Sequence, residues 1–175
     1  MLALTEALNS IRAFMERGGD VLYILLFVTF VMWVLIIERM WFFTLEYRKK
    51  RNQVVEAWEA RPERNSWYAH KIRTAMISEA SDTLNQGVLL IKTMVALCPL
   101  VGLLGTVTGM VEVFDAMASL GSSNARAMAN GVSKATIPTM SGMVAALSGV
   151  FLATYIERRA KREAERLEDS LTMDH

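Results

Sequence analysis

Residues 21–37 read VLYILLFVTFVMWVLII, a stretch without a charged side chain. Thr29 is its only polar residue apart from the aromatic Tyr23 and Trp33. A helix of this length covers about 25 Å, somewhat less than the roughly 30 Å hydrocarbon core of a bilayer. Aromatic residues at and beyond its ends are typical of membrane interfaces and extend the span. The sequence therefore predicts a transmembrane helix at residues 21–37.

Two further apolar segments, at residues 88–111 and 135–156, differ from the first in composition. Both are richer in Gly, Ala, Ser and Thr. Membrane helices gain little from hydrophobic segregation, so they associate where small residues allow close approach. The first helix is therefore predicted to face lipid, and the other two to contact protein. The predicted fold is an all-α integral membrane protein with three transmembrane helices.

The distribution of basic residues predicts the orientation. Residues 39–86 carry nine Lys and Arg residues and residues 157–175 carry five, whereas residues 1–20 and 112–134 carry two each. Loops rich in Lys and Arg stay in the cytoplasm. The loop at residues 38–87 and the tail at 157–175 are therefore predicted to be cytoplasmic. The N-terminal segment and the short hairpin at 112–134 are predicted to lie on the outer side.

The cytoplasmic parts are predicted to be long helical extensions. Residues 48–60 contain no helix breaker before Pro62, and a second helix is predicted from about residue 65 into the second apolar segment. The third transmembrane helix is predicted to continue into the tail, where the charge run is interpreted as a solvated face. The tail residues that recur at helical spacing are Ala160, Ala164, Leu167 and Leu171.

Small residues form a seam on each of the two inner helices. Packing within one subunit is one use of such seams, and oligomerisation is a second, because two seams exceed what one internal contact needs. Pro99 and Pro138 lie in the same segments. Each removes a backbone donor and is predicted to kink its helix. The predicted packing residues are Gly102, Gly105, Gly109, Gly142, Ala146 and Gly149.

Hydroxyl side chains are concentrated on the same two helices. Such a residue in a membrane helix usually bonds to the carbonyl four residues earlier. Their concentration instead favours a polar path or a polar partner. No Asp or Glu lies deep in any apolar segment, so a proton path would need a carboxylate from a partner. The hydroxyl residues are Thr106, Thr108, Thr136, Thr139, Ser141 and Ser148.

Two lysines lie near the ends of apolar segments. Lys92 is predicted to extend its ammonium group towards the headgroups. Lys134 precedes the third segment at the outer face. Two alternatives are open for it: an ion pair with Glu112 or Asp115 of the hairpin, or a contact with an acidic residue of a partner.

The sequence carries no catalytic or metal-binding pattern. The run GLLGTVTG at residues 102–109 lacks the Lys-Ser/Thr of a phosphate-binding loop. Cys98 is the only cysteine, and His70 and His175 share no ligand spacing. A net charge of +1 gives no reason to expect a nucleic-acid partner. We therefore expect no enzyme, cofactor or metal.

Two longer runs carry a family resemblance. Residues 98–114 read CPLVGLLGTVTGMVEVF, and residues 131–159 read GVSKATIPTMSGMVAALSGVFLATYIERR. Their PLxGLLGTVxGM and VAA patterns resemble the MotA/TolQ/ExbB proton-channel family, and within it a short form of ExbB from TonB systems. The resemblance implies a multi-pass protein of the bacterial inner membrane, with a periplasmic N-terminus and a cytoplasmic C-terminus.

The resemblance also implies partners and a proton path. Five copies would surround a pair of ExbD-like single-span helices, whose membrane Asp carries protons past Thr106 and Thr139. Ser141 completes the predicted path, and a TonB-like protein would use the energy for outer-membrane uptake. The family commonly has Glu where this chain has Lys134, which puts a proton-handling role for that position in doubt. A TolQ-like role in envelope maintenance and a scaffold that conducts no ions are the alternatives.

Overall fold

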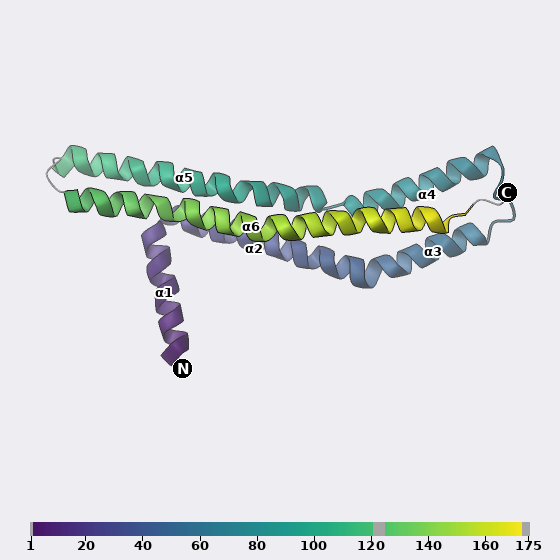
Figure 1. The fold of residues 1–175 in the computed structure, drawn as a ribbon, viewed down its shortest axis with the longest axis horizontal. Helices are drawn as coiled ribbons and strands as arrows, with labels where there is room; N and C mark the ends of the chain where they lie inside the picture. The colour runs from purple at the N-terminus through teal and green to yellow at the C-terminus, as the bar shows by residue number, and fades with distance from the viewer. Residues whose placement is uncertain (1, 121–124, 173–175) are drawn as a thin grey trace. The chain divides into compact units, whose positions relative to one another are not determined.

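The computed structural model describes residues 2–120 and 125–172, and every regular element within them is helical. Three of its helical stretches are long and apolar enough to cross a membrane: Asp20–Glu59, Trp67–Ser119 and Met128–Ser170. The predicted all-α fold with three candidate spans is thus confirmed. In chain order (Figure 1), the elements are α1 (Leu2–Gly18), α2 (Asp20–Trp41), the π-helix η1 (Phe42–Glu46), α3 (Tyr47–Glu59), α4 (Trp67–Asn85), α5 (Val88–Leu120) and α6 (Ala125–Ser170).

Helix α6 extends beyond its predicted membrane segment at both ends, whereas α5 begins at Val88 as predicted and extends only beyond the C-terminal end of its segment. The arms of the predicted hairpin at residues 112–134 are helical up to Leu120 and again from Ala125. Residues 121–124 of that hairpin lie outside the described residues. A helix does not end where the bilayer ends, so the predicted membrane limits stay predictions.

Local sequence explains where α3, α4 and α1 end or begin. Helix α3 ends before Pro62, as predicted. The hydroxyl of Ser66 caps α4 by accepting a hydrogen bond of 3.3 Å from the N–H of Ala69. Gly19 separates α1 from α2 with a φ of 70°, a left-handed conformation that glycine adopts without steric cost.

The predicted unbroken helix from residue 65 into the second apolar segment is wrong. Helix α4 ends at Asn85 and α5 begins at Val88, because Gly87 has a φ of 79°. Glycine after a helix is a common stop signal, and Gly87 is such a signal in this sequence. Arg39 of α2 lies against this break and is only 5% exposed. A methyl group added at Gly87 would lie 3.2 Å from Nε of Arg39.

We expect Gly87→Ala to lower the free energy of unfolding by about 1–2 kcal/mol, since alanine is strained at positive φ and the added methyl group would displace buried Arg39. Gly19→Ala is the matched control, because Gly19 also has positive φ but an added methyl group there meets no atom within 4 Å. Thermal unfolding of the purified protein in detergent should show the larger loss for Gly87→Ala. Equal losses of stability in the two variants would mean that the contact with Arg39 does not contribute to the effect of Gly87→Ala.

The helices form two compact units, which are described separately. Unit 1 comprises Met1–Trp33 and Thr93–Val150, and it contains α1 with parts of α2, α5 and α6. Its three long helices pack through small residues. A methyl group added at Gly149 of α6 would lie 2.6 Å from Cγ2 of Val95 of α5 and 2.5 Å from Sδ of Met32 of α2. Glycine at this position therefore allows α6 to contact both neighbours at once.

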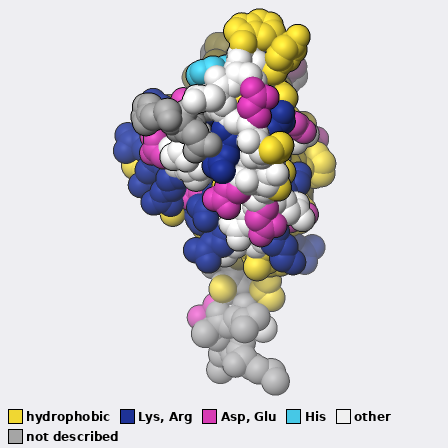
Figure 2. Space-filling model, turned by 90° about the vertical axis from the view of Figure 1, so that its right-hand side faces the viewer, with side chains coloured by type: hydrophobic (Ala, Val, Ile, Leu, Met, Phe, Trp, Pro, Cys, Tyr) yellow, Lys and Arg dark blue, Asp and Glu magenta, His cyan; other side chains and the backbone are white. Residues whose placement is uncertain are grey.

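Unit 2 comprises Val34–Lys92 and Phe151–His175. Within it, α3, α4 and the end of α6 surround a small core of Trp58, Ala69, Leu167 and Leu171. Nε1 of Trp58 donates a hydrogen bond of 3.0 Å to the carbonyl of Thr172. The predicted helical pattern of the tail is confirmed, because its small and apolar residues are buried or half-buried. Basic and acidic side chains are interspersed over the face shown in Figure 2.

Candidate functional site

Helices α5 and α6 meet backbone to backbone in unit 1 (Figure 1). A methyl group added at Gly102 would lie 2.8 Å from the carbonyl oxygen of Pro138. One added at Gly142 would lie 2.6 Å from the carbonyl oxygen of Cys98. Real side chains do not approach backbone atoms this closely, so only glycine fits at both positions. The two predicted seams therefore face each other within one chain.

The other predicted packing residues also lie at helix contacts of unit 1. A methyl group at Gly109 would lie 2.7 Å from Cβ of Ala135, and one at Gly105 would collide with the side chain of Pro138. Ala146 is 8% exposed. Packing inside a single subunit, the simpler of the two alternatives, therefore accounts for these residues. Both α5 and α6 continue as helices through Pro99 and Pro138.

Thr106 and Thr139 lie opposite each other at this close contact. Their hydroxyl groups form a hydrogen bond with each other. Oγ1 of Thr139 also donates to the carbonyl oxygen of Gly102 at 3.0 Å, and Oγ1 of Thr106 lies 3.5 Å from the same atom. Each hydroxyl can donate only one proton. Thr106 therefore donates to Oγ1 of Thr139, and Thr139 donates to the carbonyl oxygen of Gly102. The structure thus joins two predicted path residues that are 33 positions apart.

The other four hydroxyl residues predicted from the sequence bond to their own helix. Ser141 is among them, and its Oγ donates to the carbonyl of Ile137 at 2.9 Å. The simpler alternative of local bonding therefore holds for these four residues, and the threonine pair is the exception. Besides Ser141, the residues with local bonds are Thr108, Thr136 and Ser148.

The charged residues predicted for the outer mouth are exposed. Within residues 2–120 and 125–172, no ion pair joins Lys134 to Glu112 or Asp115. The structure therefore gives no support to the internal pairing of Lys134. Lys92 has a partner that was not predicted from the sequence, since its Nζ lies 2.6 Å from Oε1 of Glu157 in unit 2. The two residues are 65 positions apart, so only the fold brings them together.

Chemically, the threonine pair forms an uncharged, partly buried row of oxygens. After Thr106 donates to Thr139, the lone pairs of Thr106 Oγ1 remain free to accept a hydrogen bond. A threonine does not titrate near neutral pH, so the pair can orient a water or a carboxyl group but cannot itself carry a proton. Proton transfer at this site would therefore need a group other than these two hydroxyls.

A model of the MotA/TolQ/ExbB proton channel family matches residues 46–169. The putative biopolymer transport protein ExbB-like 1 of Synechocystis sp. is 40% identical over 67 residues, covering 37% of this chain and 26% of that protein. ExbB-like 3 of the same organism is 39% identical over 67 residues, 37% of this chain and 31% of that protein. The biopolymer transport protein exbB1 of Vibrio cholerae is 32% identical over 96 residues, 54% of this chain and 42% of that protein. The matched stretches thus span less than half of each relative.

Proposed function

Because this chain belongs to the MotA/TolQ/ExbB proton channel family, we propose that it forms part of the wall of a proton channel in the bacterial inner membrane. Three apolar helices and similarity to proteins named for biopolymer transport support this placement. In the proposed topology, the N-terminus is periplasmic and the C-terminus is cytoplasmic, in line with the excess of Lys and Arg in the loop and tail. The proposal includes no enzymatic step.

The observation that carries the proposal is the hydrogen-bonded pair of Thr106 and Thr139 at the contact of α5 and α6. The pair is polar, lies between two apolar helices and has no carboxylate of its own. An ExbD-like single-span helix with a membrane Asp would supply that group. In the proposed assembly, five copies of this chain enclose such helices, and their proton flux drives a TonB-like protein. Lys134 would pair with an acidic residue of the partner at the outer mouth.

The test is proton movement by the chain reconstituted in liposomes together with its single-span partner. We expect an imposed membrane potential to drive proton uptake, and expect Asp→Asn in the partner's span to abolish it. The matched control is the chain reconstituted without the partner. These liposomes should show no proton uptake, because the chain alone supplies no carboxylate within its apolar segments. Proton flux equal to that of empty liposomes, from a complex shown to be assembled, would favour the scaffold alternative.

The TolQ-like alternative differs in the process that the proton flux drives. It predicts detergent sensitivity of cells that lack this chain, with unchanged growth on a siderophore or haem as the iron source. The TonB-type proposal predicts the reverse pattern: loss of growth on these iron sources and normal detergent resistance.

A further inference from the structure

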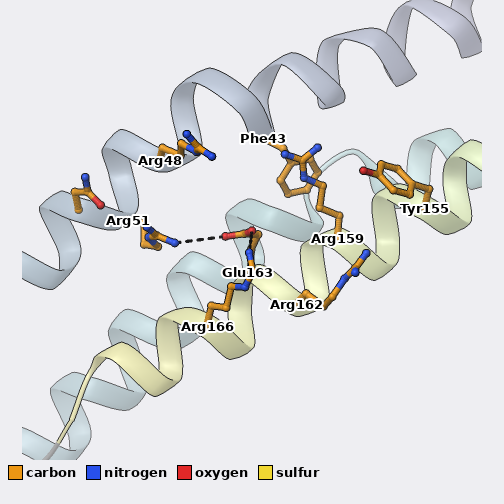
Figure 3. Close-up of a pocket in the computed structure, with 9 residues that line it drawn as sticks. Phe43, Arg48, Arg51, Tyr155, Arg159, Arg162, Glu163 and Arg166 are labelled. Carbon is orange, nitrogen blue, oxygen red and sulfur yellow. Dashed lines mark hydrogen bonds and ion pairs between the residues drawn. The ribbon is translucent and has the colours of Figure 1, made fainter.

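Unit 2 contains a cavity of about 480 Å³ between α3 and α6 (Figure 3). Phe43 of the π-helix and Tyr155 of α6 line it together with polar residues. Arginines form most of its wall, and Figure 3 shows them on two helices that are distant in sequence. They are Arg48 and Arg51 on α3 and Arg159, Arg162 and Arg166 on α6.

The arginines of this cavity greatly outnumber its acids. Glu163 is the only carboxylate of the lining, against five arginines. Its Oε1 lies 2.9 Å from Nη1 of Arg166, and its Oε2 lies 3.9 Å from Nη1 of Arg51. Within the part of the chain that the structure describes, the other three arginines of the lining form no ion pair with a carboxylate. Like charges that face one another repel, so the cavity favours an anionic occupant.

The lining also differs from a solvated helix face. Arg51 and Arg159 are half-buried, and although the other three arginines are exposed, all five border one concave space between α3 and α6 (Figure 3). The guanidinium carbon of Arg159 lies 5.7 Å from the centre of the buried Phe43 ring. A guanidinium held over a ring keeps its N–H groups available to oxygens that lie in the plane of the guanidinium. The interpretation of the tail's charge run as only a solvated face is therefore incomplete.

The cavity lies where the apolar segments end. Phe43 follows the first apolar segment by six residues, about 9 Å along a helix, and Tyr155 is in the last turn of the third. Exposed apolar side chains lie within four residues of Phe43 and Tyr155 along the chain: Met40 and Trp41 on α2 and Phe151 on α6. Aromatic residues beside Lys or Arg mark the depth of lipid headgroups, and basic pockets at this level bind anionic headgroups.

We infer that this cavity binds the phosphate headgroup of an anionic glycerophospholipid, whose acyl chains lie along the exposed apolar residues of α2 and α6. The planar, forked N–H groups of arginine match the oxygens of a phosphate diester. Arg48, Arg159 and Arg162 are the ligands, and Glu163 holds Arg51 and Arg166 in place. The inference requires that the chain spans a membrane, but it does not require proton conduction.

The test is lipid binding by the full chain, purified and delipidated in a neutral detergent. Native mass spectrometry and thermal unfolding would be followed during titration with dioleoylphosphatidylglycerol, with dioleoylphosphatidylcholine and with inorganic phosphate. We expect retention of phosphatidylglycerol and a rise in unfolding temperature with that lipid alone. Arg159→Gln/Arg162→Gln should weaken its binding by about 25-fold, because each of the two basic residues contributes on the order of a fivefold change in affinity.

The matched control is Arg158→Gln/Lys161→Gln, which removes the same charge from the same helix outside the cavity. It should leave binding within about twofold of the unaltered chain, since its charges lie outside the binding cavity and only a long-range effect remains. A salt titration of the unaltered chain gives a test without any variant, and affinity for phosphatidylglycerol should fall as NaCl rises. Equal losses in both double variants, equal binding of phosphatidylcholine, or protection by phosphate but not by lipid would each overturn the assignment.

Discussion

Replacement of both Thr106 and Thr139 by valine is expected to reduce proton flux by about tenfold or more, because the loss of one good hydrogen bond to the moving proton raises a barrier by about 1.4 kcal/mol. Valine keeps the shape of threonine and removes only the hydroxyl. The row of oxygens at Gly102 would lose both of its side-chain members. The measurement is proton uptake by liposomes that contain the chain and its single-span partner.

Thr108→Val is the matched control for this prediction. Its hydroxyl donates to the carbonyls of Leu104 and Gly105 in its own helix, and its side chain is exposed. Its removal should leave proton flux unchanged. If the double variant conducts as well as Thr108→Val, the threonine pair is a packing feature and not part of a proton path.

Stability measurements separate a functional loss from misfolding. Thr139→Val alone removes the cross-helix partner of Thr106 and the shorter side-chain hydrogen bond to the Gly102 carbonyl, so it should cost about 1–2 kcal/mol. The double variant replaces both hydroxyls and should cost less than the single one, since no hydroxyl donor is left unpaired. A double variant that unfolds with the melting temperature of the unaltered chain but does not conduct would place the effect in the proton path.

Much of the fold follows from the sequence because hydrophobicity alone decides it. The uncharged run at residues 21–37 and the apolar runs at 88–111 and 135–156 predict the three candidate spans. The tail pattern also predicts burial of Leu167 and Leu171. Periodicity could not show the break at Gly87, because one residue at positive φ interrupts a helix without changing its hydrophobic pattern. The glycine itself was the available signal.

The site was predictable residue by residue but not contact by contact. The types and places of Thr106, Thr139 and Ser141 are visible in the sequence, yet nothing local distinguishes the two that bond across helices from the one that bonds to Ile137. That difference depends on the rotation of α5 against α6, which only the packed helices define. The arginine cavity could not be predicted from the sequence for the same reason, because its lining residues come from both α3 and α6.

Gly142→Leu is expected to prevent α5 and α6 from packing, so that little monodisperse protein is recovered. Gly142→Ala gives a measurable, milder form of the same effect, and here two physical effects have opposite signs. Alanine is more favourable than glycine inside a helix by about 1 kcal/mol, which predicts stabilisation. The contact predicts the reverse, because the added methyl group would lie 2.6 Å from the carbonyl oxygen of Cys98, a backbone atom that cannot rotate away.

Overpacking of this kind typically costs about 1–3 kcal/mol, so we expect net destabilisation for Gly142→Ala. Met143→Leu is the control, since Met143 is the next residue of α6, is 56% exposed and changes little in volume. Thermal unfolding in detergent shows whether Gly142→Ala raises or lowers the stability. Gly142 lies one helical turn from Thr139, and an added methyl group at Gly142 would approach Gly102. Separation of the two helices would therefore also break the hydrogen bonds that join Thr106, Thr139 and Gly102. Gly142→Ala should therefore lower proton flux together with stability, whereas a more stable Gly142→Ala protein would contradict the close contact from which both predictions start.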